Sequence, residues 1–101
     1  MMKKVIALSS IVFSINAYSV VNCPAAKLVH IQAQTNAILY QQEGQPFHRL
    51  GKPGGPGVSE MYSALLSAQA SGKTVTIRYP DGYDCSAQDL ATNALMVRTN
   101  P

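Results

Sequence analysis

The sequence lacks the short motifs that identify common hydrolases. It contains neither the G-x-S-x-G turn that exposes a nucleophilic serine nor the H-E-x-x-H helix of zinc peptidases. Residue types able to act as bases, nucleophiles or acids are His30, His48, Ser59, Ser71, Asp81, Asp84 and Asp89. None of them lies in a recognisable catalytic setting, so we expect no enzymatic activity.

Nucleotide and calcium motifs are also missing. The tetrapeptide SGKT, residues 71–74, resembles the end of a P-loop, but Ser67 stands where the first glycine is required. A P-loop glycine precedes a helix, whereas here a helical pattern precedes Gly72 and an alternating pattern follows it. The aspartates in residues 81–89 do not have the spacing of a calcium loop. We therefore expect no cofactor and no bound metal ion.

Charge of either sign is scarce. Charged residues make up 13% of the chain, and the formal net charge is +3. The basic residues are scattered, and no basic patch is interleaved with aromatic residues. Nucleic-acid binding is therefore not expected.

A long apolar run occurs only at the N-terminus, where residues 1–19 have the pattern of a secretory signal peptide. The basic stretch MMKK precedes VIALSSIVFSI, and the small residues Ala17 and Ser19 follow. The run is short for a bilayer span, which disfavours the alternative of a membrane anchor. Cleavage after Ser19, with Ala17 as the competing position, leaves residues 20–101 as one small domain with a net charge of +1. We expect this domain to be exported, either to the periplasm or to the medium, and to have no membrane attachment after cleavage.

The chain has two cysteines, Cys23 and Cys85. In a small exported domain such a pair favours a disulfide. The bond would close a loop of about 60 residues, which the chain-entropy model values at roughly 4 kcal/mol. A metal site is the weaker alternative because only His30 and His48 could join the cysteines, and a reactive thiol would leave one cysteine unexplained.

Alternating apolar and polar residues predict three strands before residue 51. KLVHIQAQ (27–34) alternates, and Thr35-Asn36 can turn the chain into AILYQQ (37–42) as a hairpin partner. After the expected turn EGQP (43–46), FHRL (47–50) is expected to form a third short strand.

One helix is predicted after the Gly- and Pro-rich segment GKPGGPG (51–57), which is expected to be an exposed loop. The apolar stripe of this helix comprises Val58, Met61, Tyr62, Leu65 and Ala68 or Gln69. Ser59 is the expected N-cap, with Glu60 in the first turn, and Gly72 ends the helix in a left-handed conformation.

Two further strands follow the helix. KTVTIRY (73–79) is expected to bury Val75, Ile77 and Tyr79 and to expose Thr74, Thr76 and Arg78. PDG (80–82) is expected to turn, and ALMVRT (94–99) to close the fold. The predicted class is mainly β with one central α-helix (α+β), in the order β-β-(β)-α-β-β.

Residues 58–98 resemble the B subunits of the subtilase-cytotoxin and typhoid-toxin type, which belong to pertussis-like AB5 toxins. The shared cues are the helix around MYSALLSAQA, the run SGKTVTIRYPDG and the late LATNALMV. The resemblance implies a small OB-like barrel, assembly into a ring of five subunits, a toxin A subunit as partner and binding of sialylated host glycans. The serine used by the family's glycan pocket has Ala26 as its nearest match here.

Two tyrosines flank the PDG turn and suggest a ligand site. Tyr79 and Tyr83 offer flat apolar faces, and Asp81 and Asp84 place hydrogen-bond acceptors beside them. Sugar rings pack on aromatic faces while their hydroxyls need polar partners. The competing interpretation places Tyr79 in the core and Tyr83 over the disulfide.

Self-association is the last expectation. Sheet edges must be paired, covered or charged. The strands 27–34 and 94–99 are expected to be edges, and each has a single charged residue, Lys27 and Arg98. A homo-oligomer that pairs these edges is therefore expected, with the polar helix face (Ser63, Ser67 and Gln69) lining its centre.

Overall fold

The computed structural model describes residues 19–101. The expected signal peptide therefore lies, except for Ser19, outside the described residues. The elements in chain order are β1 (Val20–Asn22), β2 (Ala26–Ala33), β3 (Ile38–Gln42), β4 (Phe47–Gly51), α1 (Val58–Ser71), β5 (Thr74–Pro80) and β6 (Met96–Thr99). The chain is mainly β with one helix, as predicted. The predicted order is corrected by one strand, since β1 precedes the others.

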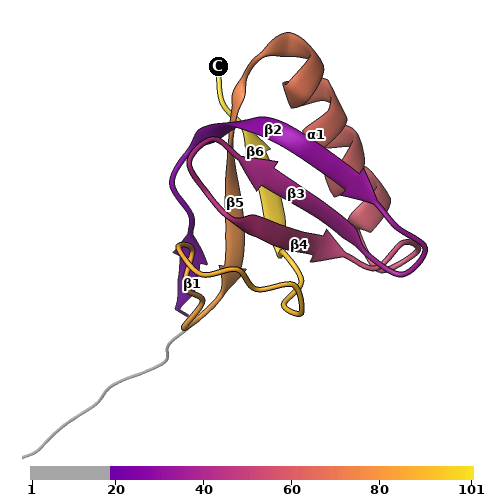
Figure 1. Cartoon of the computed structure of the whole chain (residues 1–101), viewed down its shortest axis with the longest axis vertical. Coiled ribbons are helices and arrows are strands. Elements are labelled where there is room, and N and C mark those ends of the chain that lie inside the picture. The colour runs from indigo at the N-terminus through magenta and orange to yellow at the C-terminus, as the bar shows by residue number, and fades with distance from the viewer. Residues whose placement is uncertain (1–18) are drawn as a thin grey trace, which may run out of the picture.

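The strands form one strongly curled antiparallel sheet, a half-barrel compatible with an OB-like fold (Figure 1). The strand order is β1-β5-β2-β3-β4, and β6 also pairs with β5. β1 and β2 lie end to end along one edge of β5, because Val20 pairs with Pro80 and Ala26 with Val75. The strand 27–34, expected at an edge, is instead interior, since β2 pairs with both β3 and β5. The sheet is centred on β5, which pairs with three strands, β1, β2 and β6.

A bulge in β2 decides which of its side chains reach the core. Leu28 pairs with Gln42 and His30 with Gln41, so Val29 is an extra residue. Strict alternation would place Leu28 and Ile31 on opposite faces. With the bulge, Leu28 is buried, Ile31 packs against the same cluster, and Val29 is left 43% exposed.

The Gln42 side chain lies at the point where β2 separates from β5. Its side chain is 2% exposed, and Nε2 donates to the carbonyl oxygens of Ala26 (3.2 Å) and Val75 (2.9 Å). One amide thereby bonds backbone acceptors of both strands at the point where they separate. The corner of the half-barrel is held at this residue.

The N-cap of the helix lies two residues earlier than expected, and no side chain caps the helix. Its N-cap is Gly57, with φ of 72°, so the expected cap at Ser59 is wrong. Ser59 lies within the first turn and donates to the Glu60 carboxylate. Glycine suits the position because left-handed φ is strained for other residues. The predicted end is confirmed: Gly72 has φ of 69° and caps the helix.

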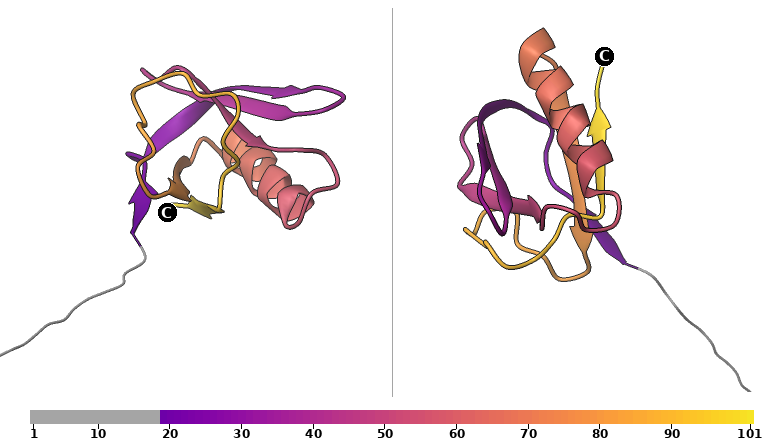
Figure 2. Two further views of the ribbon diagram at one scale, coloured as in Figure 1. Left: turned by 90° about the horizontal axis from the view of Figure 1, so that it is seen from below. Right: turned by 90° about the vertical axis from the view of Figure 1, so that its right-hand side faces the viewer.

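The predicted apolar stripe of α1 faces the core. Val58, Leu65 and Ala68 are buried, and Met61 and Tyr62 pack partly against the cluster. α1 contacts both β2 and β6, which do not pair with each other, and so bridges the two across one open side of the sheet (Figure 2).

The segment 51–57 is exposed apart from the buried Gly51 and the half-buried Gly55. Gly51 is the last residue of β4 and is buried, which corrects its assignment to the loop. A Cβ atom at this position would lie 2.7 Å from Cγ2 of Val58. Only glycine lets β4 pass so close to the start of the helix.

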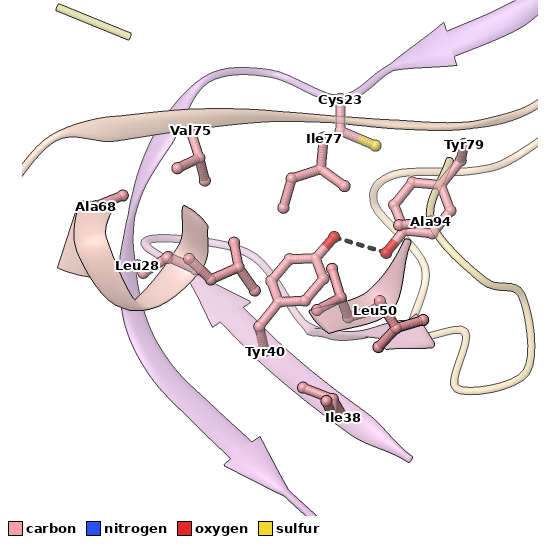
Figure 3. Packing of buried hydrophobic residues seen from close by; sticks show 12 residues of the cluster. Cys23, Leu28, Ile38, Tyr40, Leu50, Ala68, Val75, Ile77, Tyr79 and Ala94 are labelled. Carbon is pink, nitrogen blue, oxygen red and sulfur yellow. Dashed lines mark hydrogen bonds between the residues drawn. The ribbon is translucent and has the colours of Figure 1, made fainter. Parts of the chain in front are cut away.

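The core lies inside the curl of the sheet (Figure 3). Val75, Ile77 and Tyr79 are fully buried, as predicted. Thr76 was expected to be exposed, but it is buried because the Asn100 side chain lies over it and donates to its hydroxyl (3.2 Å). The residue after β6 thus covers the outer side of β5.

Candidate functional site

The segment between β5 and β6, residues 81–95, closes the open end of the half-barrel near β4 (Figure 1). It bonds to both neighbouring strands: the Ala94 N–H donates to the Leu50 carbonyl (3.0 Å) and the Leu95 N–H to the Arg78 carbonyl (2.7 Å). A single bridge pairs Asp89 with His48 of β4. The segment is therefore held on β4 and β5 at several points although it forms no strand of its own.

A disulfide ties the same segment to the N-terminal strands. Cys23 and Cys85 are bonded, with Cα atoms 5.6 Å apart, and this confirms the predicted pairing. It removes both alternatives, because neither cysteine is free to bind a metal or to react as a thiol. The bond also indicates an oxidising environment.

A surface depression of about 280 Å³ lies on this segment. Its lining residues are Pro80, Asp81, Gly82, Tyr83, Asp84, Asp89 and Thr92. The expected turn forms its start: the Tyr83 N–H donates to the Pro80 carbonyl (3.2 Å), and Gly82 has φ of 85°. Three of the four residues predicted for a ligand site, Asp81, Tyr83 and Asp84, therefore line one depression.

The fourth predicted residue, Tyr79, lies beneath the depression. Its ring is fully buried and stacks on Tyr83, with centroids 3.8 Å apart and planes 5° from parallel. Tyr79 has no surface for a ligand, but it holds the half-buried Tyr83 ring flat. The part of Tyr83 that Tyr79 does not cover faces the depression.

Hydrogen bonds fix the orientation of Tyr79. Its hydroxyl donates to the Arg49 carbonyl (2.6 Å) and lies 2.6 Å from the Tyr40 hydroxyl (Figure 3). A phenol has one hydrogen to give. Because that hydrogen goes to Arg49, the bond between the two tyrosines is donated by Tyr40. Burial raises the pKa of both phenols, so both stay protonated.

His48 supports Tyr83 from the side of β4. Its side chain is 2% exposed, and Nδ1 forms a short hydrogen bond with the Tyr83 hydroxyl. Burial lowers the pKa of His48, against the opposing effects of a backbone hydrogen bond at Cys85 and of the Asp89 charge. Burial, together with the nearby charges of Asp89 and Asp84, raises the pKa of Tyr83 to about 12. At neutral pH the pair is thus a neutral imidazole and a neutral phenol.

Two of the three aspartates in the depression are engaged in loop structure. Asp84 accepts from the Ser86 N–H (2.9 Å) and hydroxyl (2.6 Å). Asp89 accepts from the N–H groups of Ala91 and Thr92 (both 2.9 Å) and from the Thr92 hydroxyl (2.9 Å). These bonds lower the pKa of both carboxyls and keep them ionised.

The sequence patterns do not identify three residues of the site, namely His48, Asp89 and Thr92. His48 lies in a different strand, and it reaches Tyr83 across 35 residues of chain. Asp89 and Thr92 follow the turn but lie in a polar segment without periodicity. A sequence cue exists only for Asp89, whose spacing to Thr92 suits an aspartate that bonds the backbone ahead of it.

Within residues 19–101, the side chains form no group of three or more potential metal ligands. In the same part of the chain, no helix is both long and apolar enough to cross a membrane. Comparison of the chain with protein families, with curated proteins and with solved structures finds no match.

Because His48 is buried, we expect the folded protein to lose stability in mild acid. Its pKa in the folded protein lies below the value of about 6.5 expected for the unfolded chain. The unfolded chain therefore takes up the proton first, and stability falls below about pH 6.5, by up to about 1.4 kcal/mol per pH unit until the folded pKa is reached. Urea unfolding between pH 7.5 and 5 should show this slope. Asp84 and Asp89 should not contribute to this slope, because their lowered pKa values change the stability only at more acidic pH.

A matched pair of histidine variants tests the assignment. His48→Gln should remove most of the slope, and His30→Gln should retain it because exposed His30 lies on β2, stacked on Phe47. A slope that disappears in His30→Gln and survives in His48→Gln would contradict the prediction.

Proposed function

We propose that this protein is an exported, non-enzymatic binding module that holds a glycan in the depression at residues 80–92. The observation that supports this most directly is the Tyr83 ring, which is held flat by Tyr79 and fixed through its hydroxyl by His48. A flat, preorganised aromatic surface next to carboxylates offers both contacts that a sugar ring needs.

The protonation states favour binding over acid–base chemistry. His48 is fully buried and neutral, and the pKa of Tyr83 is raised to about 12. A general base works best with a pKa near the operating pH and with access to its substrate. His48 lacks that access, which supports a positioning role.

Export is part of the proposal. It rests on the signal-peptide pattern of residues 1–19 and is supported by the Cys23–Cys85 disulfide, which requires an oxidising compartment. The curled sheet with one helix is also compatible with the B subunits that the sequence resembles. A ring of five subunits that binds host glycans and has a toxin A subunit as its partner is the more specific form of this proposal.

The ring would use two outer strands of the sheet, β6 and β4, of which β4 is already bonded in part by the segment 81–95. β6 pairs with β5, and among residues 19–101 its other edge pairs with no strand. The edge at the opposite end of the sheet is β4 rather than β2. A head-to-tail contact between copies would therefore join β6 to β4, and a ring is the form in which such contacts close. Light scattering at tens of micromolar should give five subunits, and a monomer would remove the toxin-subunit form.

A stand-alone domain that binds another protein is the second candidate. A more apolar depression of about 340 Å³ favours it. It lies between the tip of the β2–β3 hairpin and the start of α1, and its lining residues include Ile38, Pro53, Val58 and Tyr62. The two candidates therefore place the ligand at different sites.

Matched tyrosine variants separate these sites. We expect Tyr83→Ala to weaken binding to a glycan array at least 10-fold, about 1.4 kcal/mol, and Tyr62→Ala to leave it unchanged. Both variants should be checked for an intact disulfide and a cooperative unfolding transition. A glycan signal lost in Tyr62→Ala and kept in Tyr83→Ala would move the site to the apolar depression, and no glycan signal from the wild type would refute the proposal.

A further inference from the structure

All the charged residues that line the depression are negative. Of its seven lining residues, three are aspartates and none is basic. Asp84 and Asp89 remain ionised well below neutral pH because loop donors hold their carboxylates. Any group that rests on Tyr83 therefore faces fixed negative charge.

The three aspartates differ in what they can offer a ligand. The donors of Ser86, Ala91 and Thr92 occupy Asp84 Oδ1 and both oxygens of Asp89. Asp81 is exposed, and within residues 19–101 its carboxylate accepts no hydrogen bond. It lies in the Pro80–Tyr83 turn, two residues before the Tyr83 ring. Within the described part of the chain, Asp81 thus has both carboxylate oxygens free for a ligand, whereas Asp84 has only Oδ2 free and Asp89 has neither.

We infer that the site selects uncharged sugars, with Asp81 accepting hydrogen bonds from two neighbouring ring hydroxyls and with the three carboxylates together repelling acidic sugars. This inference rests on the proposed function and names its ligand class. Hydrogen bonds from hydroxyls to an ionised carboxylate are stronger than neutral ones and have a defined geometry. A ligand carboxylate at the same place would meet like charges with no cation in the lining to offset them.

The inference departs from what the sequence resemblance implies. That family binds sialylated glycans, which carry a carboxylate. The position nearest to the family's pocket serine, Ala26, pairs with Val75 near the start of β5, whereas the depression begins at Pro80, where β5 ends. Ala26 and the depression lie at opposite ends of β5. The depression can therefore have a ligand specificity that differs from that of the family's pocket.

The experiment compares uncharged glycans with their sialylated forms. Lactose and N-acetyllactosamine, each with its sialylated derivative, are titrated into the oxidised, isotope-labelled protein, and backbone shifts at residues 80–92 are followed. A glycan array of neutral and acidic sugars extends the set. We expect the uncharged form of at least one pair to bind 10-fold or more tightly than its sialylated form. The difference should shrink when salt rises from 20 to 300 mM, because salt screens exposed charges.

Variants assign the selectivity to Asp81. Asp81→Asn should weaken binding of the uncharged glycan about 10-fold and reduce the difference in affinity between the uncharged and sialylated forms. Glu60→Gln, which removes an exposed carboxylate on α1, should change neither. Tighter binding of the sialylated forms with shifts at residues 80–92 would overturn the inference while leaving the glycan site standing. If no glycan shifts these residues, the proposed function fails and the inference fails with it.

Discussion

Replacing both Cys23 and Cys85 by alanine should lower the free energy of unfolding by about 4 kcal/mol. The bond joins residues 62 apart in sequence, so its loss frees a long loop in the unfolded chain. The effect is large for a small domain because the freed loop spans most of it, while the hydrogen bonds of the segment 81–95 to β4 and β5 are unchanged. Urea unfolding of the wild type and of the double variant measures the difference.

The disulfide variants have their own internal checks. Denatured, unreduced wild-type protein should show no free thiol, and two thiols per chain would contradict the bond. Loss of the bond should also broaden the NMR signals of Tyr83, which lies two residues from Cys85, before it affects the β2–β3 hairpin. A double variant as stable as the wild type would mean that the sheet alone holds the segment.

Tyr79→Phe should lower the free energy of unfolding by about 2 kcal/mol, although it removes a single oxygen atom. The hydroxyl is buried, accepts from Tyr40 and donates to the Arg49 carbonyl. Its removal leaves the buried Tyr40 hydrogen without an acceptor and takes a donor from Arg49, and each unsatisfied buried group costs about 1–3 kcal/mol. Tyr40→Phe should cost less, about 1 kcal/mol, because Tyr79 keeps its bond to Arg49.

The double variant tests the direction of these bonds. Tyr40→Phe/Tyr79→Phe should be no less stable than Tyr79→Phe, because the second change removes the orphaned donor. Chemical unfolding of the four proteins gives the coupling between the two hydroxyls. A Tyr40→Phe variant less stable than Tyr79→Phe would mean that the hydrogens run the other way.

Much of the fold follows from local patterns. The strand at 73–79 and the stripe on α1 were predicted from periodicity alone, and Gly72 was recognised because a helix end favours left-handed glycine. β1 was missed because a three-residue strand has no measurable period. The burial of Thr76 was missed because it depends on Asn100, at the far side of β6.

The residues of the candidate site also fall into two groups, those that a local pattern brings together and those that it does not. Asp81, Tyr83 and Asp84 line one depression because a tight turn keeps them together whatever the rest of the chain does, and their role as ligand residues stays a prediction. His48 joins them only through the curl of the sheet, which brings β4 to the segment after β5. No local pattern encodes such a contact. The alternation of residues 73–79 did predict the burial of Tyr79, and that burial is what excludes Tyr79 as a ligand residue.

The place of β5 in the sheet has a consequence for how fast the protein folds. β2, β3 and β4 pair with their neighbours in the chain, whereas β5 pairs with β1 across the whole domain, Val20 opposite Pro80. Such non-local pairing is slow, because the entropy of closing a long loop is lost before any contact compensates for it. We expect the rate-limiting step to be the docking of β5. The first strand has no partner until residues 74–80 are available. Under the export that we propose, the chain would therefore still be unfolded during transport, which is the state that a narrow membrane channel requires.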